Sequence, residues 1–192
     1  MLKPWFISAG IAAMLPVLAD PVTLSNPSFE QGTGGFWVNK QASARVDSSE
    51  STDGKQSLTL TALAEGSLDM ALGIPYFEDT VYEISFDAKT DPESKPELRL
   101  SMMMQGDKPI AFFEPAGEQK KQLATPPALT TQWQNFQYQI GPVPPQLLGK
   151  EVKKGMLFFK LAPGGGKVWL DNIKINTVKV SDNSEAKKKV TP

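Results

Sequence analysis

Between residues 20 and 179, short runs of apolar residues alternate one by one with polar residues, and this period of two severely limits the folds available to the chain. In one run, Tyr82, Ile84 and Phe86 are separated by Glu83 and Ser85. Successive side chains of a β-strand point to opposite faces, so such a run buries one row and exposes the other. The same pattern predicts strands over residues 58–62, 68–74, 82–88, 98–105, 136–140, 157–161 and 168–175.

The segments between these runs indicate loops, and no apolar stripe of period 3.6 with capping residues interrupts them. Proline-rich connectors occupy residues 91–96, 125–127 and 141–145. The 192 residues correspond to one domain at roughly 150 residues per domain. Seven to ten strands in about 160 residues predict an all-β fold, a two-sheet β-sandwich of the jelly-roll type.

Two residue types are missing from the chain, which contains no His and no Cys. Without His there is no Ser-His-Asp or Cys-His nucleophile and no imidazole acid or base. Without either residue there is no ordinary zinc, copper, haem or iron–sulfur site, so only hard cations held by oxygen atoms remain. The 20 basic residues nearly balance the 21 acidic ones, which gives no reason to expect a nucleic-acid partner.

Residues 1–19 are interpreted as a cleavable signal peptide. Lys3 precedes an apolar stretch of about 14 residues, and Ala19 offers a small residue before the expected cleavage site at Asp20. The stretch is shorter than the ~20 residues of a spanning helix, so we expect no membrane span after cleavage. This predicts a protein that is secreted or held in the periplasm or cell envelope. Residues 180–192 are polar and predict a disordered tail, which leaves 20–179 as the folded domain.

Five short motifs occur in order along this domain: LSNPSFE at 24–30, STDGKQSL at 51–58, VYEISFDAK at 81–89, WQNF at 133–136 and VWLDNI at 168–173. In this order they resemble the carbohydrate-binding modules of the CenC type (families 4, 9 and 22), which are galactose-binding-domain-like jelly rolls. The resemblance spans about residues 22–177. It implies a two-sheet β-sandwich, in agreement with the alternation, and a non-catalytic domain that binds polysaccharide.

Glu30 and Asp171 stand in the first and last motifs beside apolar strand residues, where an unpaired carboxylate is costly. If the first and last strands are neighbours, a cation between them would satisfy both, and calcium accepts carboxylates and backbone carbonyls together. The resemblance implies a structural Ca²⁺ with Glu30 and Asp171 as side-chain ligands, completed by carbonyls near Leu24 and residues 53–55. The alternative is that both acids cap turns or face water.

The resemblance also implies that glycan binds one face of one sheet, formed by the strands around 68–74, 98–105 and 156–161. A sugar site combines aromatic rings, for the C–H face of the sugar, with planar polar groups for its hydroxyls. The outward rows of these strands supply Asp69, Arg99, Met103, Gln105, Phe158 and Lys160, with Phe112 or Phe113 as a second ring from the next strand.

A different interpretation of these rows also stands: Met103 and Phe158 are covered by a loop, and the charges form a solvated surface. Trp37, Trp133 and Trp169 all occupy motif positions, and we expect them in the structural core.

A hydrolase would need two carboxylates about 5–9.5 Å apart. No predicted strand carries Asp or Glu two residues apart on one face, and Glu83 and Asp87 lie about 13 Å apart at the rise of a strand. We therefore expect no enzyme. Two functions remain. The first is a secreted module for polysaccharide or oligosaccharide, working beside a separately encoded glycan-active enzyme. The second is a β-sandwich for protein interaction or envelope assembly without sugar binding.

Overall fold

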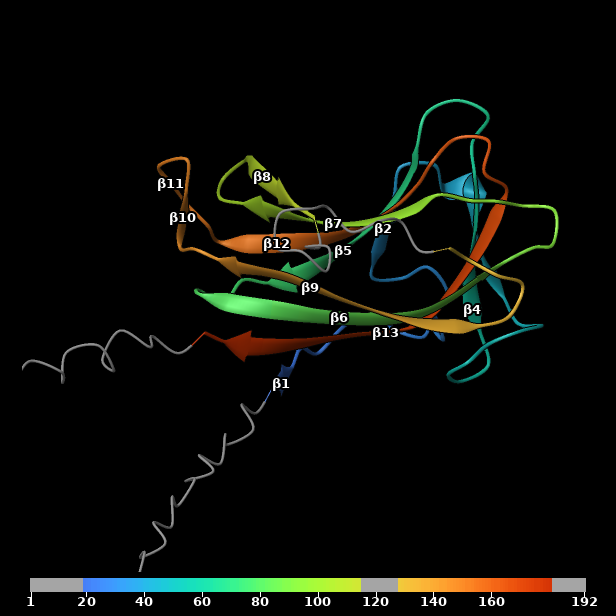
Figure 1. The fold of residues 1–192 in the computed structure, drawn as a ribbon, viewed down its shortest axis with the longest axis horizontal. Helices are drawn as coiled ribbons and strands as arrows, with labels where there is room; N and C mark the ends of the chain where they lie inside the picture. Colours follow the sequence, from blue (N-terminus) through green and yellow to red (C-terminus); the bar gives the residue numbers. More distant parts are fainter. Residues whose placement is uncertain (1–18, 115–127, 181–192) are drawn as a thin grey trace, which may run out of the picture.

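The computed structural model describes residues 19–114 and 128–180. The expected signal peptide, apart from Ala19, and the expected tail, apart from Val180, lie outside the described residues. The predicted all-β sandwich is confirmed, because the described chain is built from two main antiparallel sheets (Figure 1).

The first sheet has the order β3-β4-β13-β6-β9, with β1 paired to β13. Its strands are β1 (Asp20–Pro21), β3 (Ala44–Asp47), β4 (Ser57–Thr61), β6 (Thr80–Thr90), β9 (Gln134–Val143) and β13 (Lys167–Lys179).

The second sheet has the order β2-β5-β12-β7-β8 and lies against the first as a separate layer (Figure 1). Its strands are β2 (Phe36–Val38), β5 (Leu68–Pro75), β7 (Leu98–Gln105), β8 (Pro109–Phe113) and β12 (Lys154–Leu161). A short pair, β10 (Gln146–Leu147) and β11 (Lys150–Glu151), and one helical turn, η1 (Gln41–Ser43), complete the described elements.

The apolar rows that the alternation predicts to be inward form the core between the two sheets. Phe86 of β6 and Phe159 of β12 come from opposite layers and meet edge to face, with ring centroids 5.0 Å apart. Both are buried, as are the alternating leucines of β4 and β5. All seven predicted runs are strands, because each offers an apolar row that only a facing sheet can remove from water.

One irregularity of the last strand is visible in the sequence. Its apolar row runs Val168, Leu170 and then Ile173, which skips one position. In the structure β13 changes register against β6 between Asp171 and Lys174. Asn172 takes a positive φ of 52° there, which fits a β-bulge. The bulge turns Asp171 inward, so that its carboxylate is fully buried.

The alternation of apolar and polar residues did not predict the shortest strands of the structure. It did not predict β1, β2, β3, β10 or β11, each of four residues or fewer, because so short a run shows too little periodicity. Within residues 19–114 and 128–180, no helix is long and apolar enough to cross a membrane.

Candidate functional site

The outer face of the five-stranded sheet is the surface on which the predicted sugar-binding residues meet. On β5, Leu68, Met70, Leu72 and Ile74 point into the core, so Asp69, Ala71 and Gly73 point outward. The same parity directs the alternate residues of β12 and β7 to this face. The strand registers therefore decide which outward side chains are neighbours.

An aromatic row crosses this face. Trp37 of β2 and Phe158 of β12 both pair with Ala71, and their ring centroids lie 6.5 Å apart with planes at 69°. Phe112 of β8 meets Phe158 from the other side at 5.8 Å and 61°. Trp37 is 51% exposed and Phe112 62%, whereas Ala71 is covered. The three rings form one continuous apolar surface between the two edge strands of the sheet.

A charged row lies beside the aromatic row, one pair of residues further along the strands. Lys160 of β12 is the register partner of both Asp69 and Arg99. The Lys160 ammonium is 4.0 Å from Asp69 Oδ1, and that oxygen is buried with no hydrogen-bond partner among the described residues. The Arg99 guanidinium binds the Glu97 carboxylate. The four side chains balance in charge, and Asp69 Oδ1 is a buried acceptor without a partner in the described part of the chain.

The structure thus places Asp69, Arg99, Lys160 and Phe158 in one patch. Met103 also points to this face, but it is only 7% exposed, because it lies between its register partners Met156 and Phe112. The expectation that Met103 offers an open surface is therefore wrong. Gln105 lies at the far end of β7, about 13 Å along the strand from Ser101, the partner of Phe158. Of the two candidate second rings, Phe112 joins the patch and Phe113 packs against the core.

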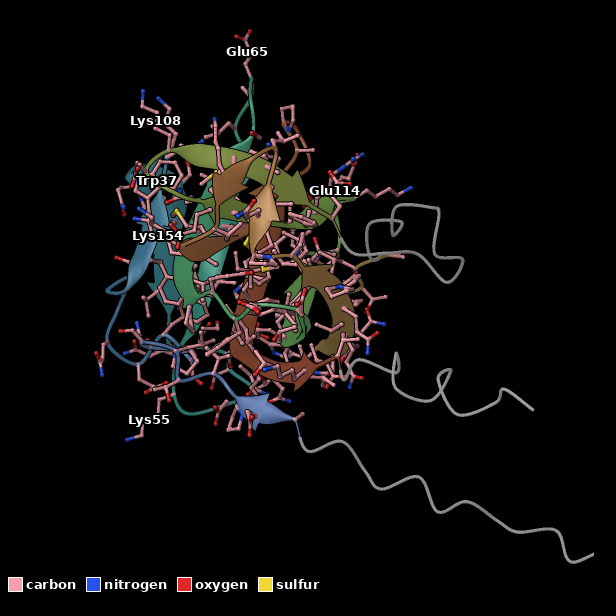
Figure 2. All side chains as sticks on the ribbon, turned by 90° about the vertical axis from the view of Figure 1, so that its left-hand side faces the viewer. Trp37, Lys55, Glu65, Lys108, Glu114 and Lys154 are labelled. Atoms are coloured by element: carbon pink, nitrogen blue, oxygen red, sulfur yellow. The ribbon has the colours of Figure 1, made fainter. Side chains whose placement is uncertain are left out.

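Trp37 does not lie in the core, contrary to the sequence-based expectation. It is half exposed at the edge of the five-stranded sheet, and Figure 2 shows it on the side of the molecule away from Glu114, which follows β8. The neighbouring Phe36 could have indicated that Trp37 points outward, because Phe36 packs against the core. On a strand, the residue after an inward side chain points outward.

Trp133 and Trp169 are also not core residues. Both are half-buried on the outer face of the six-stranded sheet, where they hold the side chain of Lys89. The Lys89 ammonium lies 4.9 Å from the Trp169 ring centroid and 5.6 Å from that of Trp133. It pairs with the Glu50 carboxylate, and burial lowers the pKa of Lys89. Because Lys89 fills the space between the two rings, these tryptophans stabilise the fold and offer no open platform.

Glu30 and Asp171 come together through one loop, residues 52–56. Asp171 Oδ2 accepts hydrogen bonds from the backbone N–H groups of Thr52 (2.6 Å) and Asp53 (2.9 Å). Glu30 Oε1 accepts from those of Lys55 (2.6 Å) and Gln56 (2.8 Å). The expected pairing of a first strand carrying Glu30 with the last strand is not found, because Glu30 lies in a turn and the strand that pairs with β13 is β1, Asp20–Pro21. The backbone N–H groups of this loop therefore bind one oxygen of each carboxylate.

Carboxylate and hydroxyl oxygens are ligands that calcium prefers, but both oxygens of Asp171 already accept N–H hydrogen bonds, Oδ2 from the loop and Oδ1 from Asn172 at 2.7 Å. Among residues 19–114 and 128–180, however, no three acidic side chains converge closely enough to hold an ion by themselves. Glu30 Oε2 has no hydrogen bond within this range. An ion at this loop would therefore depend on Glu30 and Asp171 together with backbone carbonyls.

Asp87 extends this polar network along the outer face of β6. Its carboxylate accepts hydrogen bonds from Asn135 (2.8 Å), Asn172 (3.0 Å) and the Thr52 hydroxyl (2.7 Å). Burial by itself would raise the pKa of Asp87, but these three hydrogen bonds outweigh it and hold the pKa below its ordinary value. Asp87 therefore ties the 52–56 loop to β9 and to the bulge of β13.

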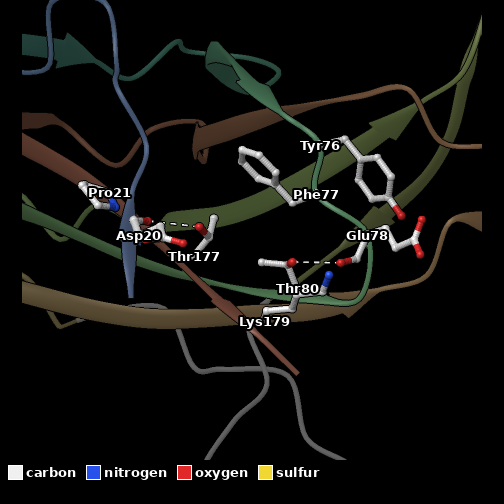
Figure 3. Close-up of a pocket in the computed structure, with 8 residues that line it drawn as sticks. All are labelled: Asp20, Pro21, Tyr76, Phe77, Glu78, Thr80, Thr177 and Lys179. Carbon is white, nitrogen blue, oxygen red and sulfur yellow. Dashed lines mark hydrogen bonds between the residues drawn. The ribbon is translucent and has the colours of Figure 1, made fainter. Parts of the chain in front are cut away.

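A separate hollow of about 590 Å³ opens beside β1, lined by Asp20, Pro21, Tyr76, Phe77, Glu78, Thr80, Thr177 and Lys179 (Figure 3). Its hydroxyl groups are paired within the fold: Thr177 donates to the Asp20 carbonyl, Thr80 to the Glu78 carbonyl and Tyr76 to the Val143 carbonyl. Burial raises the pKa of Tyr76 to about 12, so this phenol stays protonated. The aromatic row and its charged neighbours are therefore the better candidate site.

No family model matches the sequence, and no curated protein matches it significantly. Several solved structures, in contrast, are similar to this chain. The CBM22-1 xylan-binding domain of Paenibacillus barcinonensis Xyn10C is 20% identical with a TM-score of 0.58, over 86% of this chain and 96% of that one. TmCBM61, solved with β-1,4-galactotriose, is 12% identical with a TM-score of 0.50, over 80% and 97%. A Stig cyclase, Fisc of Fischerella sp. TAU, is 10% identical with a TM-score of 0.57, over 85% and 100%.

These similarities concern the fold, which the binding modules share with an enzyme. They agree with the resemblance drawn from the five motifs, since the structures named as carbohydrate-binding modules cover most of the chain. The described chain is a β-sandwich with the jelly-roll fold of the carbohydrate-binding modules.

Proposed function

We propose that the protein is a non-catalytic carbohydrate-binding module that holds polysaccharide or oligosaccharide on the outer face of its five-stranded sheet. The observation that carries the proposal is the aromatic row of Trp37, Phe158 and Phe112 directly beside the charged row. Sugars present both an apolar C–H face and hydroxyls. Rings suit the first, and charged hydrogen-bonding groups suit the second.

Asp69 and Lys160 are spaced to share a sugar hydroxyl. The gap of 4.0 Å between Asp69 Oδ1 and Lys160 Nζ is too long for a direct hydrogen bond. The Asp69 side chain is 21% exposed although its Oδ1 is shielded, so a sugar hydroxyl would donate to the exposed part of the carboxylate and accept from the nearby Lys160 ammonium. Because the charged row is balanced, we propose a neutral glycan.

The solved relatives support the same class of ligand, since one is named as xylan-binding and another was solved with a galactotriose. Binding without cleavage is proposed because each carboxylate beside the aromatic row lies against a cation, Glu97 bound to Arg99 and Asp69 4.0 Å from the Lys160 ammonium. Hydrolysis would need a free acid and base on either side of the bond to be cleaved.

A structural calcium at the 52–56 loop is part of the proposal, with Glu30 and Asp171 as its side-chain ligands. It is supported by the two carboxylates that bind this one loop. Bound calcium would supply positive charge that ties the turn at Glu30 and the strand β13 to the loop. The loop lies with the six-stranded sheet, since Asp171 belongs to β13, so calcium would stabilise the fold and take no part in contacting sugar.

We propose the cellular setting from the sequence of the N-terminal segment. An export signal at residues 1–19 would deliver the module to the medium or the cell envelope, where it would meet polysaccharide together with a separately encoded glycan-active enzyme.

The decisive experiment is a binding screen with residues 20–192. The neutral panel is xylan, β-1,4-galactan, mixed-linkage β-glucan and an algal β-1,3-glucan, with polygalacturonate as the anionic comparison. Retardation in native gels containing one of the neutral polymers, with an affinity then measured by calorimetry, is the expected result. If no polymer retards the protein, with or without calcium, the alternative of a protein-interaction or envelope-assembly domain replaces this proposal.

A further inference from the structure

The free edge of β9 is an unusual feature of the six-stranded sheet. A sheet edge presents unpaired N–H and C=O groups, and proteins commonly protect it by making the edge strand short, charged or interrupted by proline. β9 is 10 residues long. One side of it pairs with β6, and no strand among residues 19–114 and 128–180 pairs with the other side. Residues 134–140 of β9 contain neither a proline nor a charged side chain.

The other edges of the two sheets carry these protections. β3, at the opposite edge of the six-stranded sheet, has 4 residues, of which Arg45 and Asp47 are charged. In the five-stranded sheet, β2 has 3 residues, and β8 has 5 and begins with Pro109. No charged residue occurs between Lys121 and Lys150, although 21% of the chain is charged. Among the described strands, β9 is therefore the edge best suited to pair with a further strand.

The side chains of β9 suit a partner strand on both faces of the sheet. On the outer face, Asn135, Gln137 and Gln139 are exposed, and each amide can donate and accept hydrogen bonds. On the inner face, Phe136 and Tyr138 are only half-buried. Both rings pack against the same phenylalanine of β6, at centroid distances of 5.6 and 6.0 Å. A neighbouring strand would remove more of both rings from water.

We propose that β9 pairs with β9 of a second copy of this chain, in an antiparallel dimer centred on Gln137. In this register Gln137 faces the partner's Gln137. Asn135 then faces the partner's Gln139, and Phe136 faces the partner's Tyr138. Opposite side chains of antiparallel strands have Cβ atoms about 4.5–5.5 Å apart, so amides meet on one face and rings on the other. A charged partner strand would find no opposite charge on residues 134–140, whereas a second β9 needs none.

The dimer is expected to be weak and reversible. Residues 134–140 of a single edge strand bury less surface than a standard interface, so we expect a Kd on the order of 10 μM to 1 mM. Pairing joins the six-stranded sheets of two copies and leaves the aromatic row on each five-stranded sheet free. Dimerisation is therefore independent of the proposed function, and each can fail without the other.

Sedimentation velocity of residues 20–192 over a range of protein concentrations measures the association. The wild type is expected to change from monomer to dimer as the concentration rises. Gln137→Lys and Gln137→Glu are each expected to weaken the dimer at least tenfold, because like charges then face each other. Gln137 is exposed, so both variants are expected to keep the wild-type melting temperature. The matched control is Gln41→Lys, on the exposed turn η1 before β3, which is expected to dimerise like the wild type.

Mixing the two charged variants tests the register. A one-to-one mixture of Gln137→Lys and Gln137→Glu is expected to recover the association, because opposite charges then face each other at the centre of the joint. The proposal is overturned if the wild type stays monomeric at every concentration, or if the mixture associates no better than either variant alone. Slow hydrogen exchange of the β9 amides in a monomeric wild type would then show that another segment of the same chain covers the edge.

Discussion

Trp37 and Phe158 stand on strands separated by β5, yet their rings approach to 6.5 Å because only Ala71 lies between them. A larger side chain at position 71 would hold the rings apart. The small residue on β5 thus lets two separate aromatic residues become one surface, which Phe112 extends to the far edge of the sheet.

The first prediction concerns this aromatic surface. Trp37→Ala and Phe158→Ala are each expected to weaken glycan binding about tenfold, or ~1.4 kcal/mol, because each removes a ring from contact with the sugar. Isothermal titration calorimetry measures the change. Phe77→Ala, which removes a 45% exposed ring beside the hollow near β1, is the control and should bind like the wild type.

Fluorescence gives the same prediction a second readout. Ligand is expected to change tryptophan emission through Trp37, so Trp37→Phe should abolish the change and Trp133→Phe, beside Lys89, should keep it. An unchanged response in Trp37→Phe would place the ligand elsewhere.

The second prediction concerns Asp69. Asp69→Asn is expected to lower the affinity for a neutral glycan by about tenfold, since a hydrogen bond to a charged group contributes roughly 1.5–3 kcal/mol. Asp107→Asn, in an exposed ion pair with Lys153 at 2.9 Å, provides the matched change away from the site. Equal affinities for the Asp69 and Asp107 variants would show that Asp69 does not contact the glycan.

The third prediction concerns calcium. Calcium at 100 times its Kd would stabilise the fold by about 2.7 kcal/mol, which raises the melting temperature by roughly 5–10 °C for a domain of this size. Glu30→Gln should lose most of this rise, and Glu65→Gln in an exposed loop should keep it. A melting temperature that responds neither to calcium nor to EDTA would show that hydrogen bonds, without an ion, hold both carboxylates at this loop.

The fourth prediction concerns acid stability. The lowered pKa of Asp87 means that its ionised form stabilises the fold fully above about pH 3.9, the ordinary value for Asp. This contribution is lost as the pH falls through the lower pKa of the folded state. Asp87→Asn is expected to reduce the free energy of unfolding by about 1 kcal/mol at neutral pH.

Urea unfolding of both proteins between pH 7 and pH 2 measures this difference, which should shrink below pH 3.9. A difference that stays constant to pH 2 would show that the Asp87 charge does not stabilise the fold.

The alternation of Tyr82, Ile84 and Phe86 with polar residues determined the sandwich, because a period of two leaves one apolar face that only another sheet can cover. It also determined that Asp69, Arg99, Phe158 and Lys160 point away from the core, since parity along a strand is a local property. The apolar row skips one position between Leu170 and Ile173, but the bulge there was identified only in the structure.

Strand order and register are set by contacts between distant residues, so only the tertiary structure decided which outward side chains are neighbours. Register brought Lys160 beside Asp69, covered Met103 and moved Gln105 away from Phe158. The short strand β2 placed Trp37 outside the core, and Lys89 came to fill the space between Trp133 and Trp169. The sequence determined which residues face outward, and the pairing of the strands decided which of them form a site.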